Sequence, residues 1–578
     1  MIVRLKIFIF LTKRFFLVGS LLISQILLAQ NQRFWDYHKP LDIPLSLSGS
    51  FGELRTNHFH SGLDFRTQQK TGLPVYVIDE GYVSRIKVSV YGYGKVLYID
   101  HPNGYTTVYA HLDKYADKIE EYVKGLQYLN QTFEIELFPD PYQIKVNKGE
   151  LIALSGNTGS SGGPHVHFEI RDTKTEEIIN PMLFGFDMQV QDQKKPNIVA
   201  LRVYPLEEQA SVNGLQQPSL VTFTQNAGGI ITAKTIRAKG KIGLGIQCFD
   251  QSNLSYGKNG VYQIKASCNG KTLLEMQFDR FAFDHSRYLN YYLDYEYFTE
   301  TGNKFQKLFL SNDVLIPMVK KHNNFGWLEI APNKTYQIKI EVSDFHQNTS
   351  VVLLPIVFDA TEMAPKKDET KGFVLKKSRD EIFEVGPFEV MIPAKTLYED
   401  TKLDLQYLDG KLKLHHKKVP VHGSITLTFD PEKVGWSPQS YLAYMDNSKP
   451  IFEKAELMKN GTRVAYVRRL GNYQILEDKI VPNIQLANFK EGEWLSNKSQ
   501  LQVKISDQGS GIKTFNAYLN GKWILMEYEY KDNLLFHAFV DGKVQEGKND
   551  LKLVVEDNVG NSTIFETHFF KPIPNHKF

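Results

Sequence analysis

The sequence predicts an all-β protein built from several domains. In the first third of the chain, short apolar stretches lie between turn glycines, and almost no segment repeats its apolar residues at a helical period. Farther along, residues 336–344, 501–507 and 551–557 alternate apolar and polar side chains and are followed by turn residues. A length of 578 residues corresponds to about four domains. We therefore expect one N-terminal β domain followed by β-sandwiches.

The chain begins with a segment typical of a secretory signal peptide. Four basic residues lie within the first fourteen positions, and an apolar run from Phe15 to Leu28 ends at Ala29. A positive region, an apolar region and a small residue in this order predict a signal peptide over residues 1–29. The alternative is a retained membrane anchor, which the interruption by Lys13 and Arg14 disfavours because the remaining run is short for a bilayer.

Two histidines follow the glycine-rich run of residues 156–163. His165 and His167 open a strand-like segment, and side chains at i and i+2 of a strand point the same way, about 7 Å apart. Two imidazoles side by side suit metal chemistry, with one as a ligand and the other free to move protons. An exposed edge strand with two incidental histidines is the alternative.

Further ligand-type residues lie upstream. His60 and Asp64 are separated by four positions, which is roughly 13 Å in a straight strand, and Gly62 would permit a bend that brings them together. His111 ends a strand-like run that starts at Gly104. Two histidines and one aspartate around an open position are typical of a catalytic zinc site.

Together these motifs resemble the lysostaphin-like, LytM-type zinc metallopeptidases, which cut peptidoglycan cross-bridges. The resemblance spans roughly residues 51–186 and preserves the order of the motifs, which are His60–Asp64, Gly72–Val75, Gly81–Val83, Tyr93–Gly94, Tyr109–Leu112, Lys148–Glu150 and Gly156–Glu169. It implies a barrel-sandwich domain, the duplicated hybrid motif, over residues 30–188. It also implies that His60, Asp64 and His167 bind Zn²⁺, with His111 and His165 as the catalytic pair.

The same resemblance implies a function. It predicts a zinc endopeptidase that hydrolyses the stem-peptide cross-links of peptidoglycan in the periplasm or cell envelope. A non-catalytic LytM-like module, which activates a cell-wall amidase or acts in envelope assembly, is the alternative, and such modules typically lose zinc ligands. This sequence has all three implied ligands and both implied catalytic histidines. The net charge of +3, with both signs dispersed, gives no support for nucleic-acid binding.

The chain departs from the family pattern in an insertion at residues 113–147. Its segment from Glu120 to Ile144 is rich in aromatic residues. A long insertion beside a site is often a lid or a binding loop, and packing on the scaffold is the alternative.

Beyond residue 189 we expect three β-sandwiches, at residues 190–360, 372–480 and 482–575, with a linker near residues 361–371. The first and the last loosely resemble bacterial immunoglobulin-like domains. All three could contact other envelope proteins, and none carries a catalytic motif.

Two features within the first sandwich leave alternatives open. Cys248 and Cys268 either form one disulfide or stay as buried free thiols. The tyrosine-rich run from Tyr288 to Tyr297 either binds a glycan or a partner, or is a half-buried strand and loop, which we favour.

Overall fold

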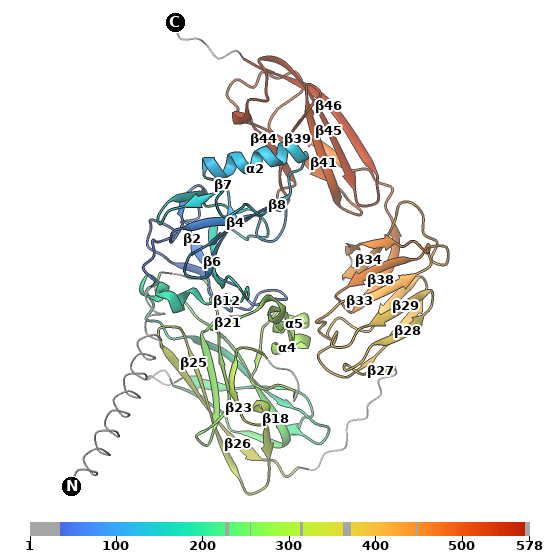
Figure 1. The fold of residues 1–578 in the computed structure, drawn as a ribbon. Coiled ribbons are helices and arrows are strands. Elements are labelled where there is room, and N and C mark those ends of the chain that lie inside the picture. Colours follow the sequence, from blue (N-terminus) through green and yellow to red (C-terminus); the bar gives the residue numbers. More distant parts are fainter. Residues whose placement is uncertain are drawn as a thin grey trace, which may run out of the picture.

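The computed structural model describes residues 35–225, 230–254, 256–311, 316–361, 372–446 and 449–572. Strands dominate these ranges, which confirms the predicted all-β class (Figure 1). The predicted signal peptide, residues 1–29, lies outside the described residues. No helix among those described is long and apolar enough to cross a bilayer.

The N-terminal domain packs two sheets around one core. The larger sheet has the order β1 (Leu47–Gly49), β2 (Leu63–Arg66), β11 (His165–Asp172), β6 (Tyr105–Leu112), β5 (Lys95–Asp100), β4 (Gly81–Val88) and β8 (Ile135–Leu137), with β9 (Lys145–Val146) and β12 (Ile178–Ile179) beside it. The smaller sheet has the order β3 (Pro74–Tyr76), β10 (Leu151–Leu154) and β7 (Lys114–Tyr115). Tyr109, Phe168 and Ile152 are fully buried in the core of this domain. Helix α2 (Asp117–Asn130) and the 3₁₀ turns η1 (Pro181–Phe184) and η2 (Phe186–Met188) complete it.

The first sandwich continues the N-terminal sheet. Its β21 (Arg280–Phe281) pairs with β12, and Phe59 of the N-terminal domain contacts Phe278 and Phe281, each with ring centroids 5.9 Å away. Its strands are β13 (Asn197–Pro205), β14 (Ser211–Val212), β15 (Ser219–Val221), β16 (Phe223–Gln225), β17 (Ile231–Ala233), β18 (Ile236–Phe249), β19 (Gln263–Cys268), β20 (Lys271–Gln277), β22 (Gln306–Lys307), β23 (Val319–His322), β24 (Leu328–Ile330), β25 (Thr335–Ser343) and β26 (Thr349–Phe358). Its short helices are α3 (Phe283–Ser286), α4 (Leu289–Tyr292), α5 (Tyr295–Thr301) and η3 (Asn324–Gly326).

The remaining two sandwiches follow in sequence. The second contains β27 (Phe373–Leu375), β28 (Glu381–Val385), β29 (Phe388–Ile392), β30 (Thr401–Leu403), β31 (Leu405–Leu408), β32 (Lys411–Leu414), β33 (Ile425–Phe429), β34 (Ser440–Asp446), β35 (Lys449–Glu453), β36 (Ala455–Leu457), β37 (Arg463–Val467) and β38 (Gly471–Glu477). The third contains β39 (Asn483–Leu486), β40 (Gln500–Ser506), β41 (Ile512–Leu519), β42 (Lys522–Ile524), β43 (Glu527–Glu529), β44 (Leu534–Ala538), η4 (Phe539–Asp541), β45 (Gly547–Asp557) and β46 (Ser562–Lys571). Each has its own hydrophobic core.

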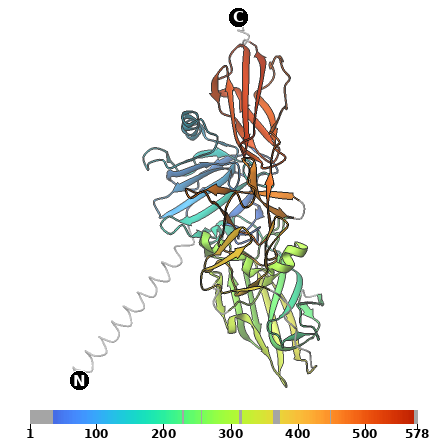
Figure 2. The same ribbon diagram turned by 90° about the vertical axis from the view of Figure 1, so that its right-hand side faces the viewer.

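The chain closes on itself as a ring of four domains. In Figure 1 it passes from the N-terminal domain through the first and second sandwiches to the third, which returns beside α2. Figure 2 shows the N-terminal domain standing to one side of a column formed by the three sandwiches. A buried ion pair joins the two ends of the ring, since Lys95 Nζ lies 2.6 Å from Glu527 Oε2.

The insertion forms much of this closing contact. Its helix α2 presents Tyr128 to Trp523, with ring centroids 5.3 Å apart, and the Tyr128 hydroxyl donates to Asp541. Phe133 lies against Phe515 of the same sandwich. None of the contacts found for residues 117–144 reaches the histidines of the sequence motifs. These contacts favour packing over a lid, and the packing is against the third sandwich, so that the insertion forms a strut between domains.

Two expectations for the first sandwich can now be compared with the structure. Both cysteines are free thiols, and the Gln306 side chain donates to Cys248 Sγ at 3.2 Å. The expectation of a strand and loop in the tyrosine-rich run was wrong, because α4 and α5 form there. Tyr291 lies against Tyr398 of the second sandwich, so the run helps to build a domain joint.

The Lys95–Glu527 pair should stabilise the closed ring. Its side chains are only 11% and 17% exposed, and Lys95→Met would leave the Glu527 carboxylate buried without its partner. Breaking a buried pair in this way typically costs about 3–5 kcal/mol. Equilibrium denaturation followed by tryptophan fluorescence should report the loss, since Trp523 lies in this interface.

The matched control is Lys118→Met, which breaks the more exposed pair with Glu150 and should cost less than about 1 kcal/mol. An equal effect of the two substitutions would show that the Lys95 pair does not hold the ring closed.

Candidate metal centre

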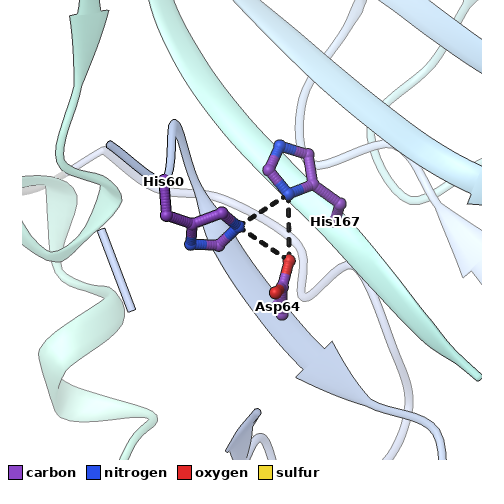
Figure 3. Close-up of side chains that lie close together, drawn as sticks. All are labelled: His60, Asp64 and His167. Carbon is purple, nitrogen blue, oxygen red and sulfur yellow. Dashed lines mark hydrogen bonds and ion pairs between the residues drawn. The ribbon is translucent and has the colours of Figure 1, made fainter. Parts of the chain in front are cut away.

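Three side chains of the N-terminal domain converge on one point (Figure 3). His60 Nε2 lies 3.0 Å from Asp64 Oδ1 and 3.0 Å from His167 Nδ1, and the latter two atoms are 2.9 Å apart. All three side chains are buried, with residue exposures of 5% or less. The structure thus brings together the three ligands that the family resemblance implied.

Strand pairing places two of these residues. β2 pairs with β11 in antiparallel register, and Asp64 lies directly opposite His167. Gly62 contributes differently from our expectation of a bend. A Cβ at this position would lie 2.2 Å from the Phe168 carbonyl oxygen, so glycine is required for the close approach of the His60–Asp64 segment to β11.

Hydrogen bonds to the far side of each imidazole fix which nitrogen faces the centre. His60 Nδ1 donates to the Ser50 carbonyl at 2.7 Å, and His167 Nε2 donates to Glu169 Oε1 at 2.9 Å. The other two nitrogens then present lone pairs toward each other and toward Asp64 Oδ1. Burial lowers the pKa of His167, but its contacts with Asp64 and Glu169 outweigh this and raise the pKa to about 9, so the point between these atoms favours positive charge, which a metal cation would supply. Two imidazoles and one carboxylate with such outer partners fit zinc.

Glu169 is buried and accepts the hydrogen bond that orients the His167 ring. Its carboxylate accepts hydrogen bonds from Ser61 Oγ at 2.6 Å and from the Tyr93 hydroxyl, and Arg171 Nη2 lies 2.6 Å away. Burial would raise the pKa of Glu169, but the neighbouring Arg171 and His167 charges outweigh it and hold the pKa well below its usual range. We did not single out Glu169 or Arg171 from the sequence. The signal was present, because His165, His167, Glu169 and Arg171 alternate along one strand and share one face.

The two other histidines of the motifs lie beside the ligands. His165 Nε2 is 3.3 Å from Asp64 Oδ1, and the His111 and His165 ring centroids are 4.8 Å apart. Each donates its Nδ1 proton to a carbonyl of the glycine-rich run, His111 to Thr158 at 2.9 Å and His165 to Gly163 at 2.8 Å. Burial, reinforced by the neighbouring imidazoles of His165 and His167, lowers the pKa of His111 to about 3. Neutral His111 therefore carries a free lone pair on Nε2.

A cavity of about 630 Å³ borders Asp64 and His165. Arg55 and Arg66 line it, and Arg55 Nη2 donates to Asp64 Oδ2 at 2.7 Å. Asp64 and the neighbouring His165 thus border a groove that two arginines also line.

The third sandwich contacts the glycine-rich run from outside the domain. Lys531 Nζ donates to the carbonyls of Asn157, Gly159 and Ser161, the last two at 3.1 and 3.4 Å. These carbonyls alternate along the run with the Thr158 carbonyl that holds His111. Tyr530 adds a ring contact to Tyr91, with centroids 4.6 Å apart.

Comparisons with known proteins agree with this geometry. Residues 58–132, which include His60, Asp64 and His111, match the family model of peptidase family M23, and residues 373–478 match that of a Zu5-like domain. A stretch of 110 residues is 36% identical to an uncharacterized metalloprotease of Haemophilus influenzae and covers 19% of this chain and 18% of that protein. Another of 111 residues is 35% identical to the peptidoglycan DD-endopeptidase ShyB of Vibrio cholerae and covers 19% and 20%.

Among solved structures, a zinc-containing peptidase from Vibrio cholerae is 29% identical, with coverage of 26% of this chain and 39% of that one and a TM-score of 0.19. The chain spans about a fifth of the length of the curated relatives named above, so the similarity concerns one domain.

Substitution of Glu169 should weaken metal binding while every proposed ligand stays in place. Glu169→Gln replaces the carboxylate that orients His167, and loss of such an outer partner typically costs 10–100-fold in metal affinity. Competition titration of the purified protein with a zinc chelator would measure the change.

The matched control is Glu176→Gln. Glu176 also pairs with Arg171, at 3.2 Å, but its side chain is 61% exposed and it does not contact His167. Zinc affinity should be unchanged in this variant. Equal affinity of the Glu169 and Glu176 variants would rule out the orienting role.

Proposed function

The N-terminal domain is a peptidase family M23 domain, and from this premise we propose that the chain is a secreted zinc endopeptidase that hydrolyses peptide cross-links of peptidoglycan. The observation that carries the proposal is the convergence of His60, Asp64 and His167 beside a second pair of histidines. A module that only docks would need neither the ligands nor the pair.

The metal would be held by His60, Asp64 and His167. When bound there, zinc supplies a water of lowered pKa and a Lewis acid for the scissile carbonyl. Side chains of the protein would then transfer the protons. His165 points its Nε2 toward Asp64 while its Nδ1 is held by Gly163, so Nε2 can accept a proton from the attacking water.

His111 would complete the reaction on the other side of the centre. The proton that His165 takes from the water would pass through His111 to the leaving amine nitrogen, because the two ring centroids are 4.8 Å apart and the lowered pKa of His111 favours release. In its transient protonated form it would also stabilise the negative charge that develops on the carbonyl oxygen. Its backbone φ of 60° is unusual for a residue other than glycine, and the bond to Thr158 fixes the ring in this conformation.

The groove favours an anionic peptide. Arg55 is paired with Glu53 and Asp64, and Arg66 would face substrate carboxylates, which the stem peptides of peptidoglycan carry. A DD-endopeptidase similar to this domain acts, by its name, on peptidoglycan, and a cross-link between stem peptides is accordingly the bond that we propose. The periplasm or cell envelope is the matching location.

Lys531 of the third sandwich is proposed as a positioning residue. It donates hydrogen bonds to the glycine-rich run. The Thr158 and Gly163 carbonyls of this run orient the two catalytic histidines. The third sandwich would thereby support the catalytic geometry without touching the substrate.

The catalytic assignment is tested by separating metal binding from hydrolysis. His60→Ala should lose zinc, whereas His165→Ala should keep most of it and lose about 10²–10⁴-fold of the hydrolysis rate. The measurement is zinc content together with digestion of purified peptidoglycan, with the products resolved by mass. His58→Ala, an exposed neighbour of the ligand set, is the control and should behave as the unmodified protein.

Two outcomes would count against this assignment. Zinc loss from His165→Ala with zinc retained in His167→Ala would exchange the roles of the two histidines. If the zinc-loaded protein left every muropeptide intact, the chain would be a docking module instead.

Lys531→Met should lower the hydrolysis rate roughly ten-fold or more while zinc content and folding stay unchanged, because small displacements of catalytic groups are costly. The control is Lys543→Met, whose ammonium lies 4.9 Å from the Tyr128 ring centroid in the same interface and does not reach the glycine-rich run. A rate equal to that of the control would contradict the positioning role.

A further inference from the structure

A cluster of acidic side chains lies where the N-terminal domain joins the first sandwich. Asp192 belongs to the connection before β13, Asp250 follows β18 and Asp344 follows β25. Oxygen atoms of Asp192 and Asp344 lie within 4.8 Å of each other and of a ring nitrogen of His346. All three aspartates, with Asn259, line a cavity of about 40 Å³, which is large enough for an ion and a water.

Buried acceptors in this cavity have no partner. Asp250 is 6% exposed and Asn259 is 3% exposed, yet Oδ1 of each makes no hydrogen bond. An unsatisfied buried polar atom typically costs about 1–3 kcal/mol, and more when it is charged. Burial, together with the charges of Asp192 and Asp344, raises the pKa of Asp250 to about 8. The cavity therefore has an excess of oxygen acceptors, and His346 is the one residue lining it that can carry a positive charge.

A second cluster lies at the joint between the second and third sandwiches. Carboxylate oxygens of Asp478, Asp507 and Asp557 lie within 4.8 Å of one another. Asp478 is 3% exposed and Asp557 is fully buried. Asp507 Oδ1 and the hydroxyl of Ser510, which is 3% exposed, have no hydrogen-bond partner. No lysine or arginine among the described residues forms an ion pair with any of the six aspartates in the two clusters.

Each cluster has its own asparagine, and the two asparagines make equivalent hydrogen bonds. Asn348 donates from its backbone to Asp344 Oδ1 at 2.8 Å and from its side chain to Asp344 Oδ2 at 2.7 Å. Asn561 makes the same two bonds to Asp557, also at 2.8 and 2.7 Å.

The same asparagine amides also reach the connecting segments. Asn348 Nδ2 donates to the Asp192 carbonyl at 3.2 Å, and Asn561 Nδ2 donates to the Asp478 carbonyl at 2.8 Å. The first and third sandwiches therefore repeat one construction, in which a connecting aspartate meets two aspartates at strand ends.

We infer that each cluster binds one calcium ion, the first through Asp192, Asp250 and Asp344 and the second through Asp478, Asp507 and Asp557. Carboxylate and amide oxygens are the ligands of hard cations, and calcium accepts six to eight of them in irregular geometry. Magnesium demands near-ideal octahedral geometry and keeps several waters, which suits a crowded carboxylate cluster less well. The second cluster offers oxygen ligands only, which sets it apart from the zinc-type centre.

The position of the clusters gives the ions a structural role. Asp192 and Asp478 each belong to the segment that enters a sandwich from the preceding domain, whereas their partners belong to the sandwich itself. An ion bound to both would fix the entering segment against the sandwich and stiffen that joint of the ring.

The test uses the full-length, zinc-loaded protein, so that the zinc-type centre is occupied. After calcium is removed with a chelator and zinc, which the chelator also removes, is restored, calorimetric titration should find two calcium ions per chain, and calcium should raise the melting temperature. Asp250→Asn and Asp507→Asn should each remove one ion, and the double variant should remove both. Asp409→Asn, in an exposed turn at φ 50° that asparagine also adopts, is the control and should keep two.

The proposal fails if calcium changes neither the heat of titration nor the melting temperature of the unmodified protein, a result that needs no variant. It also fails if the double variant, shown to be folded by circular dichroism and by its zinc content, still binds two ions. Equal or greater stabilisation by Mg²⁺ at the same concentration would overturn the assignment to calcium.

Discussion

The pairing of β2 with β11 is the constraint on which the metal centre depends. β11 lies between β2 and β6 in the larger sheet, so that Asp64 faces His167 on one side and Ala110, next to His111, faces it on the other. Because side chains alternate along a strand, a shift of one residue would turn His167 into the core and Phe168 into the groove. The fully buried Val166, Phe168 and Ile170 prevent such a shift.

The polar face of β11 is stable in the interior because each charged side chain contacts the next one along the strand. His167 contacts Glu169, and Glu169 in turn contacts Arg171, with Ser61 and Tyr93 satisfying further lone pairs. A buried carboxylate without these partners would be costly. The same series orients the ligand nitrogen of His167, so the requirement for a stable core and the requirement for a metal site are met by the same contacts.

Local patterns in the sequence predicted the all-β class and drew attention to every histidine of the centre, since strand period and motif order are encoded within short stretches. Glu169 was predictable by the same period of two and was missed. The docking of α2 on the third sandwich was not predictable, because it joins Tyr128 to Asp541 across 413 positions and depends on shape rather than on a local pattern. The helical tyrosine run was missed because its aromatic composition favours strands when it is read without its packing partners.

The proposed role of Lys531 would make the metal centre of the N-terminal domain depend on the rest of the chain. Lys531 reaches Gly159 across 372 positions, and three domain joints lie between them. Each flexible joint would lower the effective concentration of Lys531 at the glycine-rich run. The strut of α2 and the buried Lys95–Glu527 pair oppose this loss at the point of closure, whereas aromatic contacts such as Tyr291–Tyr398 oppose it at a joint within the ring. Under this proposal, the orientation of His111 and His165 is coupled to the order of the whole ring, and the stiffness of its joints would affect the geometry of the site.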